Sequence, residues 1–122
     1  MKSIQVLLVD DDMMVQKLAH HVLDDRGIQL WNAYDTSEAD SILQRQKIDV
    51  ILCDVVMTPE NGLDYYNRLR RRCVRTPVIL MSAQMSSVGM QQGVQSDAAS
   101  YLIKPFGMDQ IYQRILEALA WF

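Results

Sequence analysis

Short apolar runs alternate along the chain with longer segments in which apolar residues recur every three or four positions. The runs are rich in Val, Ile and Leu, which is typical of strands that are buried on both faces of a sheet. We therefore expect five strands, at Ile4–Val9, Gln29–Ala33, Val50–Cys53, Val78–Met81 and Ser100–Ile103.

The segments between and after these runs have the spacing of amphipathic helices. Their apolar stripes are Met14, Leu18 and Val22, with Val15, Ala19 and Leu23 beside them; Ala39, Ile42 and Leu43; Leu63, Tyr66 and Leu69; and Met108, Ile111, Ile115 and Leu119. Gly27 is suited to end the first helix, and either Asp35 or Thr36 to begin the second. A weaker fourth helix is expected at roughly 84–95, where two glycines each cost about 1 kcal/mol relative to Ala.

The alternation of strands and helices predicts a parallel α/β sheet with helices on both faces, because each parallel crossover needs a helix and is right-handed. The length of 122 residues suits one domain, so residues 1–122 are expected to share a single core. Functional groups in such sheets collect at the carboxyl ends of the strands.

Composition and charge exclude several classes of protein. Apolar residues make up 49% and charged residues 22% of the chain, which is typical of a soluble globular protein, and no apolar run could span a bilayer. The acidic residues directly after the first run argue against a signal peptide, so we expect a cytoplasmic protein. The net charge of −3 excludes a generally basic surface for nucleic acid. Five arginines between Arg68 and Arg75 fit the solvated end of a helix better than a binding patch.

Polar side chains follow four of the five predicted strands. They are Asp10, Asp11 and Asp12 after the first strand, Asp54 after the third, Ser82 after the fourth and Lys104 after the fifth. Two carboxylates about 4 Å apart repel by about 4 kcal/mol at an effective dielectric constant of about 20, so such a cluster needs a compensating cation. Mg²⁺ suits this role, because it binds through one or two carboxylates and keeps several waters.

The same groups suit the transfer of a phosphoryl group. A carboxylate can act as the nucleophile and form an acyl phosphate. The Lys104 ammonium and the Ser82 hydroxyl would donate hydrogen bonds to the phosphoryl oxygens, while a metal and a lysine neutralise charge. Each residue alone has an ordinary structural explanation, such as a helix cap or a turn. The hypothesis therefore depends on their joint occurrence at four strand ends.

Four segments carry a resemblance to a known family. The segments LLVDDD, ILCDVVM, VILMSA and YLIKPF, in this order and at this spacing, resemble the receiver domain of two-component response regulators over essentially the whole chain. The resemblance implies a flavodoxin-like, doubly wound sheet of five parallel strands in the order 2-1-3-4-5, with five helices on its two faces.

The resemblance assigns the acidic residues to phosphoryl transfer and metal binding. Asp54 corresponds to the phosphoacceptor of the family. Mg²⁺ would be held by Asp10, Asp11, Asp54 and the backbone carbonyl of Val56, with Asp11 as a direct ligand and Asp10 acting largely through water.

Three further residues would respond to the phosphoryl group. The resemblance implies that Ser82 moves toward it, that the ring of Tyr101 then turns inward, and that Lys104 contacts it directly. The bond between Lys104 and Pro105 is expected to be cis. These movements would alter the surface formed by the fourth helix, the fifth strand and the fifth helix.

The implied donor is the phosphohistidine of a sensor histidine kinase or of a histidine phosphotransfer protein. The switched surface would control an unidentified downstream protein or output domain, and a phosphorylation-dependent homodimer is compatible with it. Such a chain is not a turnover enzyme, although it assists its own phosphorylation and dephosphorylation, and it is not expected to bind nucleic acid or membrane. The alternative is a receiver-like interaction module that is never phosphorylated. A phosphatase would need a second carboxylate at the position of Val56.

The loop after Asp54 departs from the family pattern Met-Pro-x-Met-Asp-Gly. It reads Met57-Thr58-Pro59-Glu60-Asn61-Gly62, which keeps the length and the final glycine but shifts the proline by one position. The sequence therefore leaves the shape of this loop, and with it the affinity for Mg²⁺, open.

Overall fold

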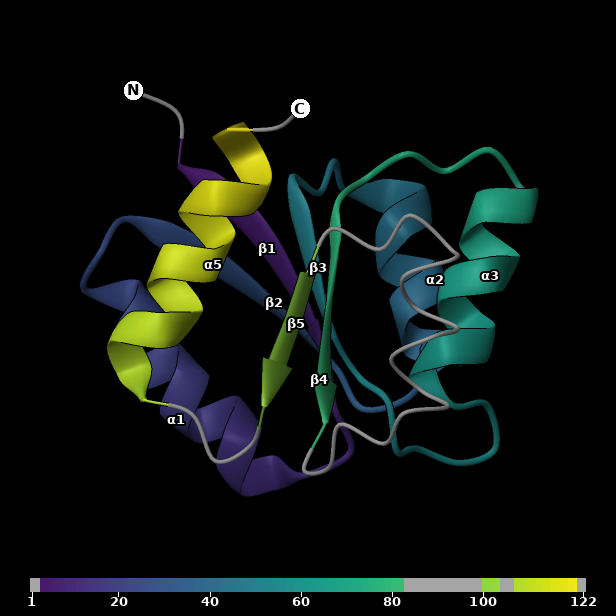
Figure 1. The fold of residues 1–122 in the computed structure, drawn as a ribbon, viewed down its shortest axis with the longest axis horizontal. Coiled ribbons are helices and arrows are strands. Elements are labelled where there is room, and N and C mark those ends of the chain that lie inside the picture. Colours follow the sequence, from purple (N-terminus) through teal and green to yellow (C-terminus); the bar gives the residue numbers. More distant parts are fainter. Residues whose placement is uncertain (1–2, 83–99, 104–106, 121–122) are drawn as a thin grey trace.

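A five-stranded parallel sheet runs through the middle of the molecule (Figure 1). The computed structural model describes residues 3–82, 100–103 and 107–120. The strands are β1 (Ile4–Val9), β2 (Ile28–Ala33), β3 (Val50–Asp54), β4 (Val78–Ser82) and β5 (Ser100–Ile103). They lie in the order β2-β1-β3-β4-β5, and every neighbouring pair is parallel. This confirms the predicted fold class and strand order.

All five predicted strands are present, and the differences are single residues at their ends. Strand β2 begins one residue earlier than expected, at Ile28. Strands β3 and β4 each continue one residue further, so that Asp54 and Ser82 are the last residues of their strands. The ladder hydrogen bonds of the sheet therefore fix the backbone of both of these candidate site residues.

Helices cover both faces of the sheet (Figure 1). Helices α1 (Met13–Asp24) and α5 (Met108–Ala120) lie on one face, and helices α2 (Thr36–Arg45) and α3 (Gly62–Arg71) lie on the other. These are the four helices of the described residues, and the helix expected at roughly 84–95 lies outside them. None of the four combines the length and the apolar character that a membrane span requires.

The core consists of two apolar layers, one on each side of the sheet. Alternate residues of a strand point to opposite faces. In β1, Val6 and Leu8 pack beneath α1 and α5, whereas Leu7 and Val9 pack beneath α2 and α3. Because helices cover both faces of the sheet, the residues that point to either face must be apolar. This explains why the strands appear in the sequence as continuous apolar runs.

The buried face of α1 includes only part of the predicted apolar face. Met14 and Leu18 are 71% and 49% exposed, so the stripe that joins them is not the core face. Ala19 and Leu23, which were predicted beside that stripe, are buried, and the polar residue Gln16 is buried with them. The prediction was wrong for Met14 and Leu18, because the buried face turns toward Gln16, whose amide is hydrogen-bonded inside the protein, and an apolar period cannot indicate this.

The corrected face of α1 predicts different costs for one substitution at two positions. Leu23→Ala should lower the free energy of unfolding by about 2–5 kcal/mol, because it leaves a cavity in the core. Leu18→Ala should change it by about 0.5 kcal/mol or less, because Leu18 is largely in solvent. Urea unfolding of both variants measures the difference, and equal losses would contradict this orientation of the helix.

Candidate metal centre

Three carboxylates meet at the carboxyl ends of β1 and β3. Asp10 and Asp11 follow β1, and Asp54 ends β3. The two strands are neighbours, with Val9 opposite Cys53, so the residues that follow lie side by side. One oxygen from each of Asp10, Asp11 and Asp54 lies within 4.8 Å of the others. The predicted acidic cluster is therefore present in the structure.

Burial divides the three carboxylates. Asp10 is fully buried and Asp54 is 6% exposed, whereas Asp11 lies at the surface. Backbone amides hold the two buried groups, since the Asp12 N–H donates to Asp10 Oδ1 at 2.9 Å and the Val56 N–H donates to Asp54 Oδ1 at 3.2 Å. The cluster is thus fixed by its own loops and reaches solvent through Asp11.

Asp12, the third carboxylate of the run, has a different role. Its side chain accepts a hydrogen bond from the Met14 N–H at 2.9 Å and caps the N-terminus of α1. An acidic residue at this place also suits the positive pole of the helix. The ordinary explanation for an acidic residue after a strand therefore applies to Asp12, and not to Asp10 and Asp11.

The donor set of the cluster fits a hard divalent cation. Three carboxylate oxygens in close proximity carry up to three negative charges, and two of these groups are shielded from water. Mg²⁺ prefers oxygen ligands and retains several waters, which the exposed side of the cluster can accommodate. Asp10, Asp11 and Asp54 could hold such an ion.

Of the other predicted site residues, Ser82 lies at the same edge of the sheet. Ser82 ends β4 and is buried, and the residue before it, Met81, is the register partner of Asp54. Lys104 and its bond to Pro105 lie outside the described residues, directly after the end of β5 at Ile103.

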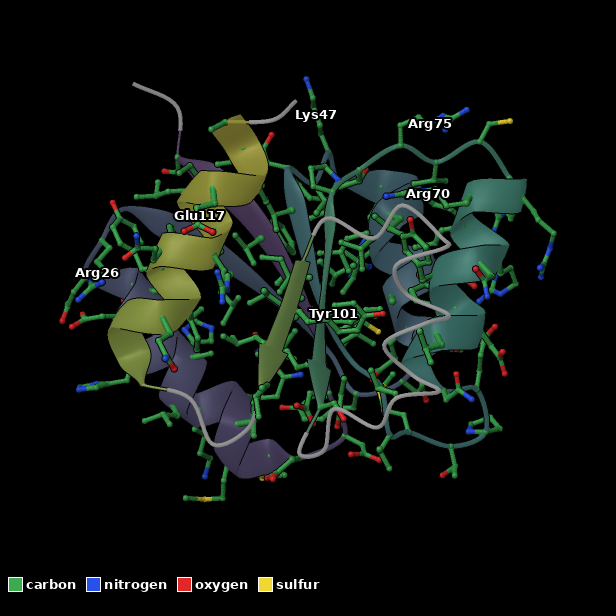
Figure 2. The ribbon with its side chains drawn as sticks, in the orientation of Figure 1. Arg26, Lys47, Arg70, Arg75, Tyr101 and Glu117 are labelled. Atoms are coloured by element: carbon green, nitrogen blue, oxygen red, sulfur yellow. The ribbon has the colours of Figure 1, made fainter. Side chains whose placement is uncertain are left out.

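Tyr101 lies on β5, and its half-buried ring extends toward the side of the sheet that carries α3 (Figure 2). There it packs against the core layer that contains Tyr66. Burial raises the pKa of the Tyr101 phenol, and the proximity of Tyr66 raises it further. In this structure the ring of Tyr101 is therefore packed against the core, and Tyr101 is not part of the carboxylate cluster.

The loop from Val55 to Gly62 closes tightly behind Asp54. The Gly62 N–H donates to the Val55 carbonyl at 2.9 Å. A Cβ added to Gly62 would lie 2.3 Å from the backbone oxygen of Asp54, so only glycine fits at this position. Within the loop, the Thr58–Pro59 bond is cis and the Val56 side chain is 71% exposed.

Gln16 is a residue of this region that sequence reasoning missed. Its amide nitrogen lies 2.9 to 3.2 Å from the carbonyl oxygens of Leu8, Asp10 and Ala33. Its own oxygen accepts a hydrogen bond from the Asn32 side chain. One buried amide thereby fastens α1 to the ends of β1 and β2 and fixes the backbone of Asp10. The sequence feature that could have indicated this role is the position of Gln16, a polar residue on the helix face that contains Ala19 and Leu23.

Cys53 is the residue before Asp54 and lies inside the core, as predicted from its apolar surroundings. Burial raises the pKa of its thiol, and the negative charges of Asp54 and Asp10 raise it further. The thiol therefore stays protonated and does not add a charge to the cluster.

Comparison with known proteins decides the family. The sequence profile of the response regulator receiver domain matches residues 6–116, which include the carboxylate cluster and Ser82. The chain belongs to this family. Its members are receiver domains of two-component signalling systems, and they act as signalling modules and not as turnover enzymes.

Two curated relatives of the receiver family are transcriptional regulators. The transcriptional regulatory protein CpxR of Klebsiella pneumoniae is 35% identical over 111 residues, which cover 91% of this chain and 47% of the relative. The alginate biosynthesis regulator AlgB of Pseudomonas syringae is 30% identical over 107 residues, which cover 88% of this chain and 24% of the relative. The chain therefore spans half or less of the length of these relatives.

Solved receiver structures have the same fold. The receiver domain of the Francisella response regulator 1452 superposes with a TM-score of 0.90 at 29% identity and covers 98% of both chains. The chemotaxis protein CheY4 of Vibrio cholerae superposes with a TM-score of 0.89 at 28% identity, over 96% of this chain and 99% of its own.

The close approach of Gly62 to Asp54 predicts that Gly62→Ala disturbs the site. The added methyl group must displace the backbone of Asp54 or of the loop, so we expect a loss of about 1–3 kcal/mol in the free energy of unfolding, together with weaker Mg²⁺ binding. Gly107→Ala is the matched control, since no described atom lies within 4 Å of its Cβ, and it should cost less than about 1 kcal/mol. Similar losses in both variants would argue against this contact.

Proposed function

We propose that this receiver domain is a switch that is phosphorylated on Asp54 in a Mg²⁺-dependent reaction. The observation that carries the proposal is the carboxylate cluster, because Asp54 ends a buried strand with its oxygens beside those of Asp10 and Asp11. A nucleophile in such a place can reach a substrate in solvent and yet be held by the sheet.

In the proposed reaction, a carboxylate oxygen of Asp54 attacks the phosphorus of a phosphohistidine. The phosphorus–nitrogen bond breaks, the imidazole leaves, and an acyl phosphate forms on Asp54. The Val56 N–H holds one oxygen of Asp54 at 3.2 Å and so limits the rotation of the carboxylate. Asp10, Asp11, Asp54 and the Val56 carbonyl would hold Mg²⁺, which offsets the charge of the carboxylates and of the incoming phosphoryl oxygens.

The phosphoryl group would then bias the conformation of the domain. Ser82 at the end of β4 and Lys104 after β5 would donate hydrogen bonds to its oxygens, and the ring of Tyr101 would follow Ser82 inward. Ser82 and Tyr101 belong to the neighbouring strands β4 and β5. The altered surface would be that of the fourth helix, β5 and α5.

The proposed partners are those of a phosphorelay. The donor would be a sensor histidine kinase or a histidine phosphotransfer protein in the cytoplasm. The recipient of the signal would be an output domain or a separate protein, since residues 1–122 are proposed to form one receiver domain. The relatives CpxR and AlgB are named as transcriptional regulators, which supports the control of transcription as one outcome.

The direct test is phosphorylation by a small acyl phosphate. We expect acetyl phosphate with Mg²⁺ to add one phosphoryl group to the intact protein, detected by mass spectrometry, and no addition without Mg²⁺ or in Asp54→Asn. Asp12→Asn is the matched control: it makes the same change two residues from Asp10, at a helix cap outside the cluster, and should still be modified.

The outcome that would contradict the proposal is a folded wild-type protein that neither gains a phosphoryl group nor binds beryllofluoride, which mimics the phosphoryl group and requires the metal and Asp54. The chain would then be an interaction module with a receiver fold.

A further inference from the structure

The unusual loop after Asp54 is joined to α3 by a bidentate ion pair. Arg68 Nε donates to Glu60 Oε2 at 3.0 Å, and Arg68 Nη2 donates to Glu60 Oε1 at 2.9 Å. The same Nη2 lies 3.0 Å from Asp40 Oδ2 on α2. A single guanidinium therefore connects the loop to both helices of this face of the sheet.

Neighbouring groups hold this guanidinium in place. The Tyr65 hydroxyl donates to Asp40 Oδ1 at 3.0 Å, and the Arg68 guanidinium lies 4.9 Å from the centre of the Tyr65 ring. Arg72 adds a longer contact of 3.8 Å to Asp40. The hydrogen bonds from Arg68 and Thr36 lower the pKa of Glu60, so its carboxylate keeps its charge as the pH falls below the range of an ordinary glutamate. The Arg68 guanidinium is thus paired with the carboxylates of Glu60 and Asp40, and Asp40 is also hydrogen-bonded to Tyr65.

The network also accounts for much of the arginine-rich segment. Arg68 and Arg72 contact Asp40, and Arg70 donates to the Val74 carbonyl at 2.7 Å while lying 4.7 Å from the centre of the Tyr66 ring. Arg70 and Arg75 lie toward the end of the molecule opposite the carboxyl ends of the strands (Figure 2). Arg68, Arg70 and Arg72 are therefore engaged in contacts within the protein.

Glu60 is well placed to control the loop that carries Val56. It is the one charged residue between Val55 and Asn61. The Gly62 N–H closes one end of the loop on Val55, and Met57 is buried in the core. Between Met57 and the cap of α3 at Asn61, the ion pair with Arg68 ties Glu60 to α3, and a hydrogen bond with Thr36 ties it to α2.

The geometry points to Glu60 and Arg68 as positioning residues that preorganise this loop for Mg²⁺. This inference rests on the proposed function, in which the Val56 carbonyl is a metal ligand. The side chains of Arg68, Glu60 and Asp40 are only 29%, 24% and 26% exposed, so solvent and salt screen the pair less than an ordinary surface ion pair. Substitution of residues that orient metal ligands in this way commonly weakens metal binding by about 10-fold or more.

Calorimetric titration with Mg²⁺ tests the inference on the full chain. We expect Glu60→Ala and Arg68→Ala each to weaken Mg²⁺ binding by about 10-fold, and the double variant to be no weaker than either single one, because each removes the same contact. Glu60→Gln, which keeps a hydrogen-bond acceptor for Arg68, should recover part of the loss. Glu117→Ala is the matched control, since it breaks an exposed pair with Arg114 on α5 and should leave the affinity within about 2-fold.

Amide hydrogen exchange without metal gives a second measurement. The amides of residues 55–62 should exchange faster in Glu60→Ala than in the wild type, whereas those of β1 should not change. If wild-type protein binds Mg²⁺ and the Glu60 and Arg68 variants bind it equally well, the inference is overturned and the proposed function stands. If wild-type protein binds no Mg²⁺, both are overturned.

Discussion

The crowding of three carboxylates at one edge of a buried sheet is the constraint on which the candidate site depends. The carboxyl ends of parallel strands lie at the same edge of the sheet, so β1 and β3 bring one carboxylate oxygen from each of Asp10, Asp11 and Asp54 within 4.8 Å of the others. Like charges at such distances repel strongly when they are shielded from water. Backbone N–H groups donate hydrogen bonds to Asp10 and Asp54, and Asp11 is exposed to solvent. The arrangement of the three carboxylates also suits a divalent cation, which would offset their charge.

The elements that hold this cluster together come from distant parts of the chain. The Gln16 side chain donates a hydrogen bond to the backbone carbonyl of Asp10, and the absence of a side chain at Gly62 allows the loop to contact the backbone of Asp54. Glu60 extends the support to α2 and α3 through Arg68. Metal affinity commonly depends on residues that contact and orient the metal ligands, because a ligand that can rotate binds the metal less tightly. The contacts that position the site therefore come from α1, α2 and α3 as well as from the strands.

The sequence predicted the fold and the position of the cluster because both follow from local patterns. The apolar runs located the five strands of the described residues, and the acidic residues after the first and third runs located the cluster of Asp10, Asp11 and Asp54. It predicted Ala19 and Leu23 on the buried face of α1 but could not predict Gln16 there, because Gln16 is buried through hydrogen bonds to residues of β1 and β2. It also showed that the loop after Asp54 was unusual, but the ion pair between Glu60 and Arg68 depends on how the loop folds against α3.

Thermal unfolding with increasing Mg²⁺ tests the central claim most directly, with wild-type protein beside Asp11→Asn. Asp11 is exposed, so this change removes one charge from the cluster and leaves the core intact. We predict that Mg²⁺ raises the wild-type midpoint in a saturable way, because the ion binds the folded state, and that the variant shows little or no rise. A wild-type midpoint that does not respond to Mg²⁺, or an equal response in the variant, would contradict the account.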